Sequence, residues 1–178
     1  MLSLTLYVNL NHSNMKELDE LMAMPVEERS KLPWNDSRLD FVARKLEEQF
    51  KLPEDSLRAL KYAENTGLVN GKISLSKNDS TAVSPAGARG IMQIMPSTME
   101  LQGGKFKHNH LDPVESLYTA ASYLSTTMQQ YKGNVAAAFA DYNGGPKAAK
   151  DVLKGKRPKN KETNNYLTKI EKFYEERQ

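Results

Sequence analysis

The sequence predicts a mainly α-helical protein that forms one domain. Apolar residues recur at intervals of three and four along several segments, which is the spacing of a helix face packed on a core. The chain has 178 residues, which is long enough for one well-packed core and short for two. Glycine, proline and polar residues separate the helical segments. A small β element is expected either in the N-terminal region or in residues 65–84.

Residues 1–50 are expected to form an N-terminal extension packed on the core formed by residues 51–178. Alternating apolar residues at positions 2–8 predict a short strand, and residues 14–24 predict a helix. Trp34 is interpreted as a packing anchor, because aromatic side chains are usually buried. Residues 36–50 form an amphipathic helix whose apolar face is Leu39, Val42, Ala43, Leu46 and Phe50.

The rest of the chain reads as helices joined by polar loops. A helix follows Pro53 and ends at Glu64, and residues 65–84 form a long polar loop. Another helix starts after Pro96, and a loop covers residues 103–109. Further helices are expected at 112–131, 135–142 and 162–175, where apolar residues again have helical spacing. Gly144-Gly145 should end the second of these, and Pro146 can begin the next segment.

The composition excludes cysteine chemistry and leaves open the binding of an anionic polymer. There is no cysteine, so disulfides and thiolate metal ligands are excluded. His108 and His110 are spaced poorly for a metal site, so no metal and no cofactor are expected. Residues 147–161 hold six lysines and one arginine against one acid, which fits a solvated face or attraction to an anionic polymer. No export signal and no membrane span are visible, so a protein that acts outside the cytoplasm would need another route outward.

The most informative tract is Ser84-Pro85-Ala86-Gly87-Ala88-Arg89-Gly90-Ile91-Met92-Gln93-Ile94-Met95-Pro96. Glycines let the backbone approach a ligand closely, and the apolar run after them is interrupted by one amide, Gln93. That amide needs a hydrogen-bond partner, whereas Ile91, Ile94 and Met95 are interpreted as core. Gln93 is therefore a candidate ligand-binding residue.

Four features stand in a recognisable order along the chain. Glu64 ends a helix, the Gly90–Pro96 tract follows, and then come Tyr142-Asn143-Gly144-Gly145-Pro146 and Glu162-Thr163-Asn164-Asn165-Tyr166. This order resembles the soluble lytic transglycosylase family of the lysozyme-like superfamily, which cleaves bacterial peptidoglycan. The resemblance covers residues 51–173 and implies a lysozyme-like catalytic domain.

The resemblance also implies a site. Glu64 would be the catalytic residue, a single acid and base that cleaves the bond between N-acetylmuramic acid and N-acetylglucosamine with formation of a 1,6-anhydro ring. A carboxyl group beside the core can stay protonated near neutral pH, as such an acid must. The residues implied to bind the glycan strand are Gln93, Met92, Tyr142, Asn143 and Ser84, and those implied to support the site are Glu162 and Gly90.

Three departures from the family pattern concern substrate positioning. Asn65 replaces the usual serine after the glutamate, residues 65–79 carry an insertion, and Asp141 replaces a small residue before Tyr142. One alternative is a hydrolytic muramidase similar to goose-type lysozyme, in which Asp79 or Asp141 holds a water. Another is a non-catalytic wall-binding or structural module, and nucleic-acid binding ranks low because the lysine run lacks interleaved aromatics. The expected setting is a bacteriophage virion or tail, or a secretion or conjugation machine, with partner proteins from that assembly.

Overall fold

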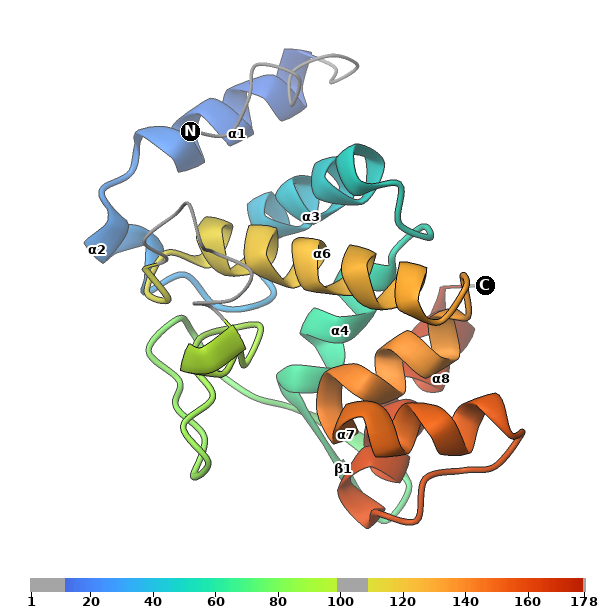
Figure 1. Ribbon diagram of the computed structural model, residues 1–178. Coiled ribbons are helices and arrows are strands. Elements are labelled where there is room, and N and C mark those ends of the chain that lie inside the picture. The colour runs from blue at the N-terminus through green and yellow to red at the C-terminus, as the bar shows by residue number, and fades with distance from the viewer. Residues whose placement is uncertain (1–11, 99–108, 178) are drawn as a thin grey trace.

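The structure of the protein, a computed structural model, describes residues 12–98 and 109–177 (Figure 1). The predicted mainly α class is confirmed. The helices are α1 His12–Ala23, α2 Val26–Arg29, α3 Ser37–Phe50, α4 Ser56–Glu64, α6 Pro113–Gln130, α7 Val135–Leu153 and α8 Lys161–Glu176, and the strands are β1 Thr66–Val69 and β2 Lys72–Leu75. Residues 96–98 add one short helical turn.

One apolar core joins the helices. Helix α3 packs on α6, α4 packs on α8, and α7 contacts both α6 and α8. In Figure 1, α4 runs behind α6 toward α7 and α8, so its C-terminal end lies among the helices of the C-terminal half. Of the five residues predicted for the inner face of α3, Leu39, Val42, Ala43 and Leu46 are buried, and Phe50 is partly buried against the core.

The helix boundaries follow from capping side chains. The Asp112 carboxylate accepts a hydrogen bond from the Val114 amide, and Pro113 occupies the first turn, where it costs no hydrogen bond. Asn134 caps α7 by accepting from the Ala137 amide at 3.0 Å. Both helices therefore begin where the sequence predicts.

Helix α7 is broken at the predicted glycines. Gly145 has φ 75° and ψ −173°, which is not helical, and Pro146 starts the second half. A positive φ is readily adopted only by glycine, so this residue turns the chain between the two halves. The break lies directly after Tyr142 and Asn143.

The predicted β element lies within residues 65–84. Strands β1 and β2 pair antiparallel from Thr66 opposite Leu75 to Val69 opposite Lys72. Asn70 and Gly71, with φ 51° and 74°, make the two-residue turn between them, and this pairing suits the twist of a hairpin. The strand predicted at residues 2–8 lies outside the described residues.

The segment before α3 is attached to the core by buried polar contacts. Arg29 and Asp112 form an ion pair at 2.6 Å, and both side chains are almost fully buried. Trp34 is buried as expected, and its indole donates to the Ser76 carbonyl at 3.1 Å. Helix α3 itself forms part of the core, and the proposed division into residues 1–50 and 51–178 stays a prediction.

Candidate functional site

Glu64 is the last residue of α4, and its carboxyl group stands where the helix meets α7 and α8. The side chain is partly exposed. Burial raises its pKa from the ordinary 4.5 to about 8, while Tyr166 and Lys169 lower it and Glu162 raises it further. The carboxyl group is therefore protonated at neutral pH and can donate a proton.

Lys169 of α8 lies against the end of α4. Its ammonium donates to the Ala63 carbonyl at 2.6 Å and to the Thr66 carbonyl at 2.7 Å. The last carbonyls of a helix lack partners within it, so these bonds hold the backbone on both sides of Glu64. The attraction of this charge for the Glu64 carboxylate opposes the effect of burial on the pKa.

Two tyrosines complete the surroundings of Glu64. Burial, followed by the charge of Glu64, raises the pKa of Tyr142 and of Tyr166 well above the ordinary value. The Tyr142 hydroxyl donates to the Met92 carbonyl at 2.7 Å, instead of reaching Glu64 as the resemblance implies. Among the described residues, the buried Tyr166 hydroxyl has no hydrogen bond of ordinary geometry, yet its influence on the pKa of Glu64 places it next to that carboxyl group.

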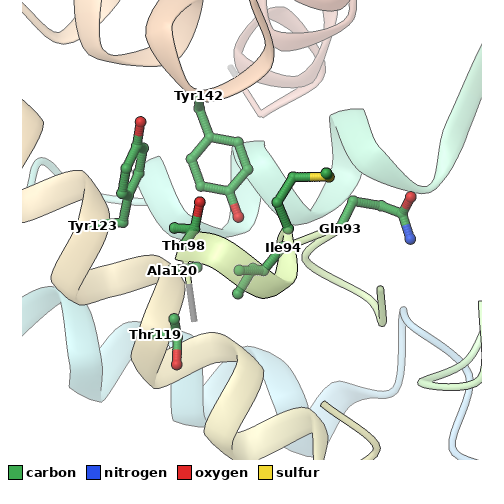
Figure 2. A pocket seen from close by; sticks show the side chains of 8 residues that line it. Gln93, Ile94, Thr98, Thr119, Ala120, Tyr123 and Tyr142 are labelled. Carbon is green, nitrogen blue, oxygen red and sulfur yellow. The ribbon is translucent and has the colours of Figure 1, made fainter. Parts of the chain in front are cut away.

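Tyr142 also lines a pocket. Its walls come from the tract, from α6 and from α7, and Figure 2 shows the Tyr123 and Tyr142 rings over the segment that carries Ile94 and Thr98. The two rings meet edge to face with centroids 5.8 Å apart. The lining residues are Gln93, Ile94, Met95, Thr98, Thr119, Ala120, Tyr123 and Tyr142. Glu64 does not line this pocket, and Tyr142 is the residue that connects the two.

Gln93 has a strained backbone that the tract holds in place. Its φ is 48°, and its side-chain nitrogen donates to the Gly90 carbonyl at 2.9 Å. Its amide points away from the two tyrosine rings in Figure 2. Gly90 is required at its position, because a Cβ there would lie 3.0 Å from the His110 carbonyl and φ is 76°. The supporting role implied for Gly90 thus has a steric basis.

The other residues implied to bind substrate lie differently from the expectation. The Met92 side chain is fully buried in the core, and only its carbonyl takes part, through Tyr142. Ser84 lies in a turn, where its hydroxyl accepts from the Ala88 amide at 3.0 Å, and it does not line the pocket. Asn143 is near the site and donates to Glu162 over a long 3.5 Å.

Glu162 is exposed in the first turn of α8, where the Asn160 side chain caps its amide. The resemblance implies a buried glutamate that orients the tyrosine. In the structure, Glu162 is an acidic residue at the N-terminus of α8, where its negative charge interacts favourably with the helix dipole. It affects Glu64 through its charge, which raises the pKa of Glu64.

The two carboxylates considered as second acids differ in how far they are engaged. Asp141 is buried, and its two oxygens accept hydrogen bonds from the hydroxyls of Tyr123, at 2.6 Å, and Tyr131. Asp79 is half-buried, and a single one of its oxygens accepts from the amide and the hydroxyl of Thr81. Asp79 therefore keeps an acceptor for a water, whereas both oxygens of Asp141 are occupied.

Several site residues were missed by the sequence reasoning. Met95 was expected in the core, but it is 40% exposed and lines the pocket, because the turn at Gln93 rotates it outward. Lys169 lies three residues after Tyr166, hence on the same face of α8, and that spacing could have identified it. Tyr123 similarly follows Ala120 by three residues along α6, on the face that lines the pocket.

The described segments contain neither a cluster of metal ligands nor a helix that could span a membrane. Within residues 12–98 and 109–177, no three His, Cys, Asp or Glu side chains gather in a way that could hold a metal ion. No described helix is long and apolar enough to cross a membrane.

Comparisons with known proteins agree on one family and fold. The model of the Transglycosylase SLT domain family matches residues 73–166, just over half of the chain, and Glu64 lies before this segment. Among solved structures, the lytic transglycosylase Slt from Pseudomonas aeruginosa, in an inactive glutamate-to-glutamine mutant, matches with a TM-score of 0.57 and 23% identity. The match covers 76% of this chain and 24% of that one, so the chain spans about a quarter of the length of Slt. At this identity the likeness shows the lysozyme-like fold.

Proposed function

Because the chain belongs to the Transglycosylase SLT domain family, we propose that it is a peptidoglycan lytic transglycosylase in which Glu64 is the single acid and base. The observation that carries this proposal is the placement of Glu64. It ends α4 on a partly exposed surface, beside Lys169 and Tyr166 of α8 and near Tyr142, which lines the pocket. The mutated glutamate of the inactive Slt mutant is consistent with a family that depends on one carboxyl group.

The proposed reaction uses this carboxyl group twice. Glu64 donates its proton to the oxygen that links N-acetylmuramic acid to N-acetylglucosamine, and that bond breaks. The acetamido group of the muramoyl residue assists at the anomeric carbon. The Glu64 carboxylate then takes the proton of the muramoyl 6-hydroxyl, whose oxygen closes the 1,6-anhydro ring. The proton gained and lost at Glu64 balances, and no water is consumed.

The surroundings of Glu64 suit both steps. Burial favours the protonated form that the first step needs, and Lys169 stabilises the carboxylate that results. The Tyr123 and Tyr142 rings offer an aromatic wall for the apolar face of a sugar ring. The oxygen of Gln93 remains on the tract for a hydrogen bond from a glycan hydroxyl or amide.

The experiment is product analysis on purified peptidoglycan with the wild type and Glu64→Gln. We expect anhydromuropeptides from the wild type by mass spectrometry and a loss of turnover of at least about 100-fold in the variant, because removal of a general acid typically costs this much. Reducing ends without anhydro products would show the hydrolytic alternative. Unchanged glycan with retained wall binding in both proteins would show the non-catalytic module.

The hydrolytic alternative has less support than the transglycosylase. A hydrolase of this type needs a second carboxylate that holds a water several ångströms from the acid. Both oxygens of Asp141 are occupied by tyrosine hydroxyls, and neither Asp141 nor Asp79 is among the groups that shift the pKa of Glu64. Delivery by a bacteriophage particle or a secretion machine stays a prediction based on the sequence.

A further inference from the structure

We infer that Asn65 is a positioning residue that holds the helix end bearing Glu64 against the tract bearing Gln93. The inference rests on the proposed function for its catalytic meaning. Asn65 follows Glu64 directly, at the C-cap of α4, and it is only 2% exposed.

The side-chain amide of Asn65 donates two hydrogen bonds and accepts one. Its nitrogen donates to the Lys61 carbonyl and to the Ile91 carbonyl, both at 2.7 Å. Its oxygen accepts from the Asn78 side chain at 3.3 Å. The reverse orientation would set the oxygen against two carbonyl oxygens, so this one is fixed by chemistry. A serine hydroxyl has one proton and could serve only one of the two carbonyls.

The hydrogen bond from Asn65 to the Ile91 carbonyl holds the tract two residues before Gln93. Ile91 is fully buried, and a buried carbonyl requires a partner. The next carbonyl, that of Met92, accepts from the Tyr142 hydroxyl at 2.7 Å. Asn65 and Tyr142 thus hold two successive carbonyls immediately before Gln93, whose φ of 48° is unfavourable for a residue with a side chain.

The same residue also anchors the inserted segment. The Ser76 amide donates to the Asn65 carbonyl at 3.2 Å, which closes the hairpin onto the end of α4. The Asn78 carbonyl in turn accepts from the Trp34 amide at 2.9 Å, and Lys61 donates to the Trp34 carbonyl at 2.8 Å. Asn65 therefore joins the catalytic helix, the tract, the hairpin and the segment before α3.

Two other side chains hold the same helix end without touching the tract. The Thr66 hydroxyl donates to the Tyr62 carbonyl at 2.7 Å, and Lys169 holds Ala63 and Thr66. Replacement of Thr66 by valine removes one hydrogen bond to a carbonyl at the end of α4, as loss of the Asn65–Lys61 bond does, and leaves the link between helix and tract intact. Thr66→Val is thus the matched control for Asn65.

The first test compares the steady-state cleavage rates of Asn65→Ser, Asn65→Ala and Thr66→Val with the wild type. We expect kcat to fall about 10- to 100-fold in both Asn65 variants, with alanine the slower, because displacement of reacting groups by about 1 Å costs up to 100-fold. KM should stay within about 3-fold, and kcat of Thr66→Val within about 2-fold of the wild type at a similar loss of thermal stability. An equal fall in kcat for Thr66→Val would overturn the inference, since Asn65 would then act only through helix stability.

Two further measurements test the inference. The first asks whether Asn65 positions Glu64 or only shields it from water, and the second does not depend on the proposed activity. Asn65 is neutral, so the pH at which kcat/KM declines should be the same in Asn65→Ser and the wild type; a shift toward the ordinary glutamate pKa would mean that Asn65 merely excludes water. Amide hydrogen exchange at residues 89–94 should be at least about 10-fold faster in Asn65→Ser and unchanged in Thr66→Val. This measurement needs no substrate, and unaltered exchange in Asn65→Ser would overturn the inference even if the protein proves inactive.

Discussion

At the scale of single residues, a raised carboxyl pKa does not by itself identify a catalytic acid. Burial raises the pKa of Glu47 to about 8, the same value as for Glu64. Glu47 is 4% exposed, and one of its oxygens has no hydrogen-bond partner among the described residues. Glu64 differs because it is partly exposed and is surrounded by Lys169, Tyr142 and Tyr166. Its neighbours, more than its pKa, make it the candidate.

The pH dependence of cleavage should report the titration of Glu64, whose pKa responds to the charges of Lys169 and Glu162. Activity is expected to decline as pH rises through about 8, because the acid loses its proton. Lys169→Met removes a charge that favours the carboxylate, so the pKa of Glu64 rises and the decline moves to higher pH. The measurement is kcat/KM against pH.

Glu162→Gln is the control, because it should shift the pKa of Glu64 in the opposite direction to Lys169→Met. The charge of Glu162 raises the pKa of Glu64, so its removal should move the decline to lower pH, by less than Lys169→Met because Glu162 is exposed. Shifts of the same sign in the two variants would contradict the assignment of the pH dependence to Glu64.

Glu64 should also lower the stability of the fold at high pH. Its folded pKa of about 8 exceeds the ordinary 4.5, so ionisation penalises the folded state progressively between these values and fully above 8. We therefore expect Glu64→Gln to melt at a higher temperature than the wild type at pH 9, with a smaller difference at pH 4. Calorimetry at both pH values measures this, and a difference independent of pH would show that Glu64 does not carry the shift.

At the scale of elements, the break in α7 brings this helix close to α8. A Cβ added to Gly144 would lie 2.5 Å from the Thr163 hydroxyl and 2.8 Å from the Ala148 Cβ. Gly144→Ala must therefore push the two helices apart, and we expect a loss of about 1–3 kcal/mol in the free energy of unfolding. Denaturant titration measures it.

Gly67→Ala provides the comparison for that loss. Its Cβ would also meet an oxygen at 2.6 Å, but that atom is the end of the exposed Ser74 side chain, which can rotate away. We expect a change below about 1 kcal/mol. Equal losses in the two variants would mean that the contact between α7 and α8 is not as tight as the structure shows.

The sequence could predict the elements better than the side-chain contacts between them. Capping residues such as Asp112 and Asn134 act on neighbours in the chain, so the helix starts could be read directly. The hydrogen bonds of Asn65 and Lys169 join residues 26 and 106 positions apart, and no local pattern encodes such distances. Met95 was misjudged for the same reason, because the backbone turn at Gln93 depends on these distant contacts.

At the scale of the whole molecule, the N-terminal segment is joined to α6 by the buried pair of Arg29 and Asp112. Arg29→Met leaves the Asp112 charge buried without its partner, which should lower the free energy of unfolding by about 3–5 kcal/mol. Arg38→Met breaks a more exposed pair with Asp36 and should cost no more than about 1 kcal/mol. Thermal melts of both variants test this, and similar losses would show that the Arg29 pair is not shielded from water.

The lysines of residues 147–161 are exposed on the same molecule. Within the described part of the chain, none of the six forms an ion pair within 4.0 Å, whereas Arg157 among them pairs with Glu171. This leaves both earlier interpretations, a solvated face and attraction to an anionic polymer, as predictions.

The contacts between α4 and α8 have a consequence for the order of events during synthesis. The groups that surround Glu64 include Tyr166 and Lys169, which are added to the growing chain about a hundred residues after it. Until α8 has been made, neither of these groups can act on the Glu64 carboxyl group, and no packing against α8 can shield it from water. The raised pKa that the proposed function asks of Glu64 therefore depends on docking of the last helix, and a chain that ends before α8 should carry a glutamate of ordinary acidity.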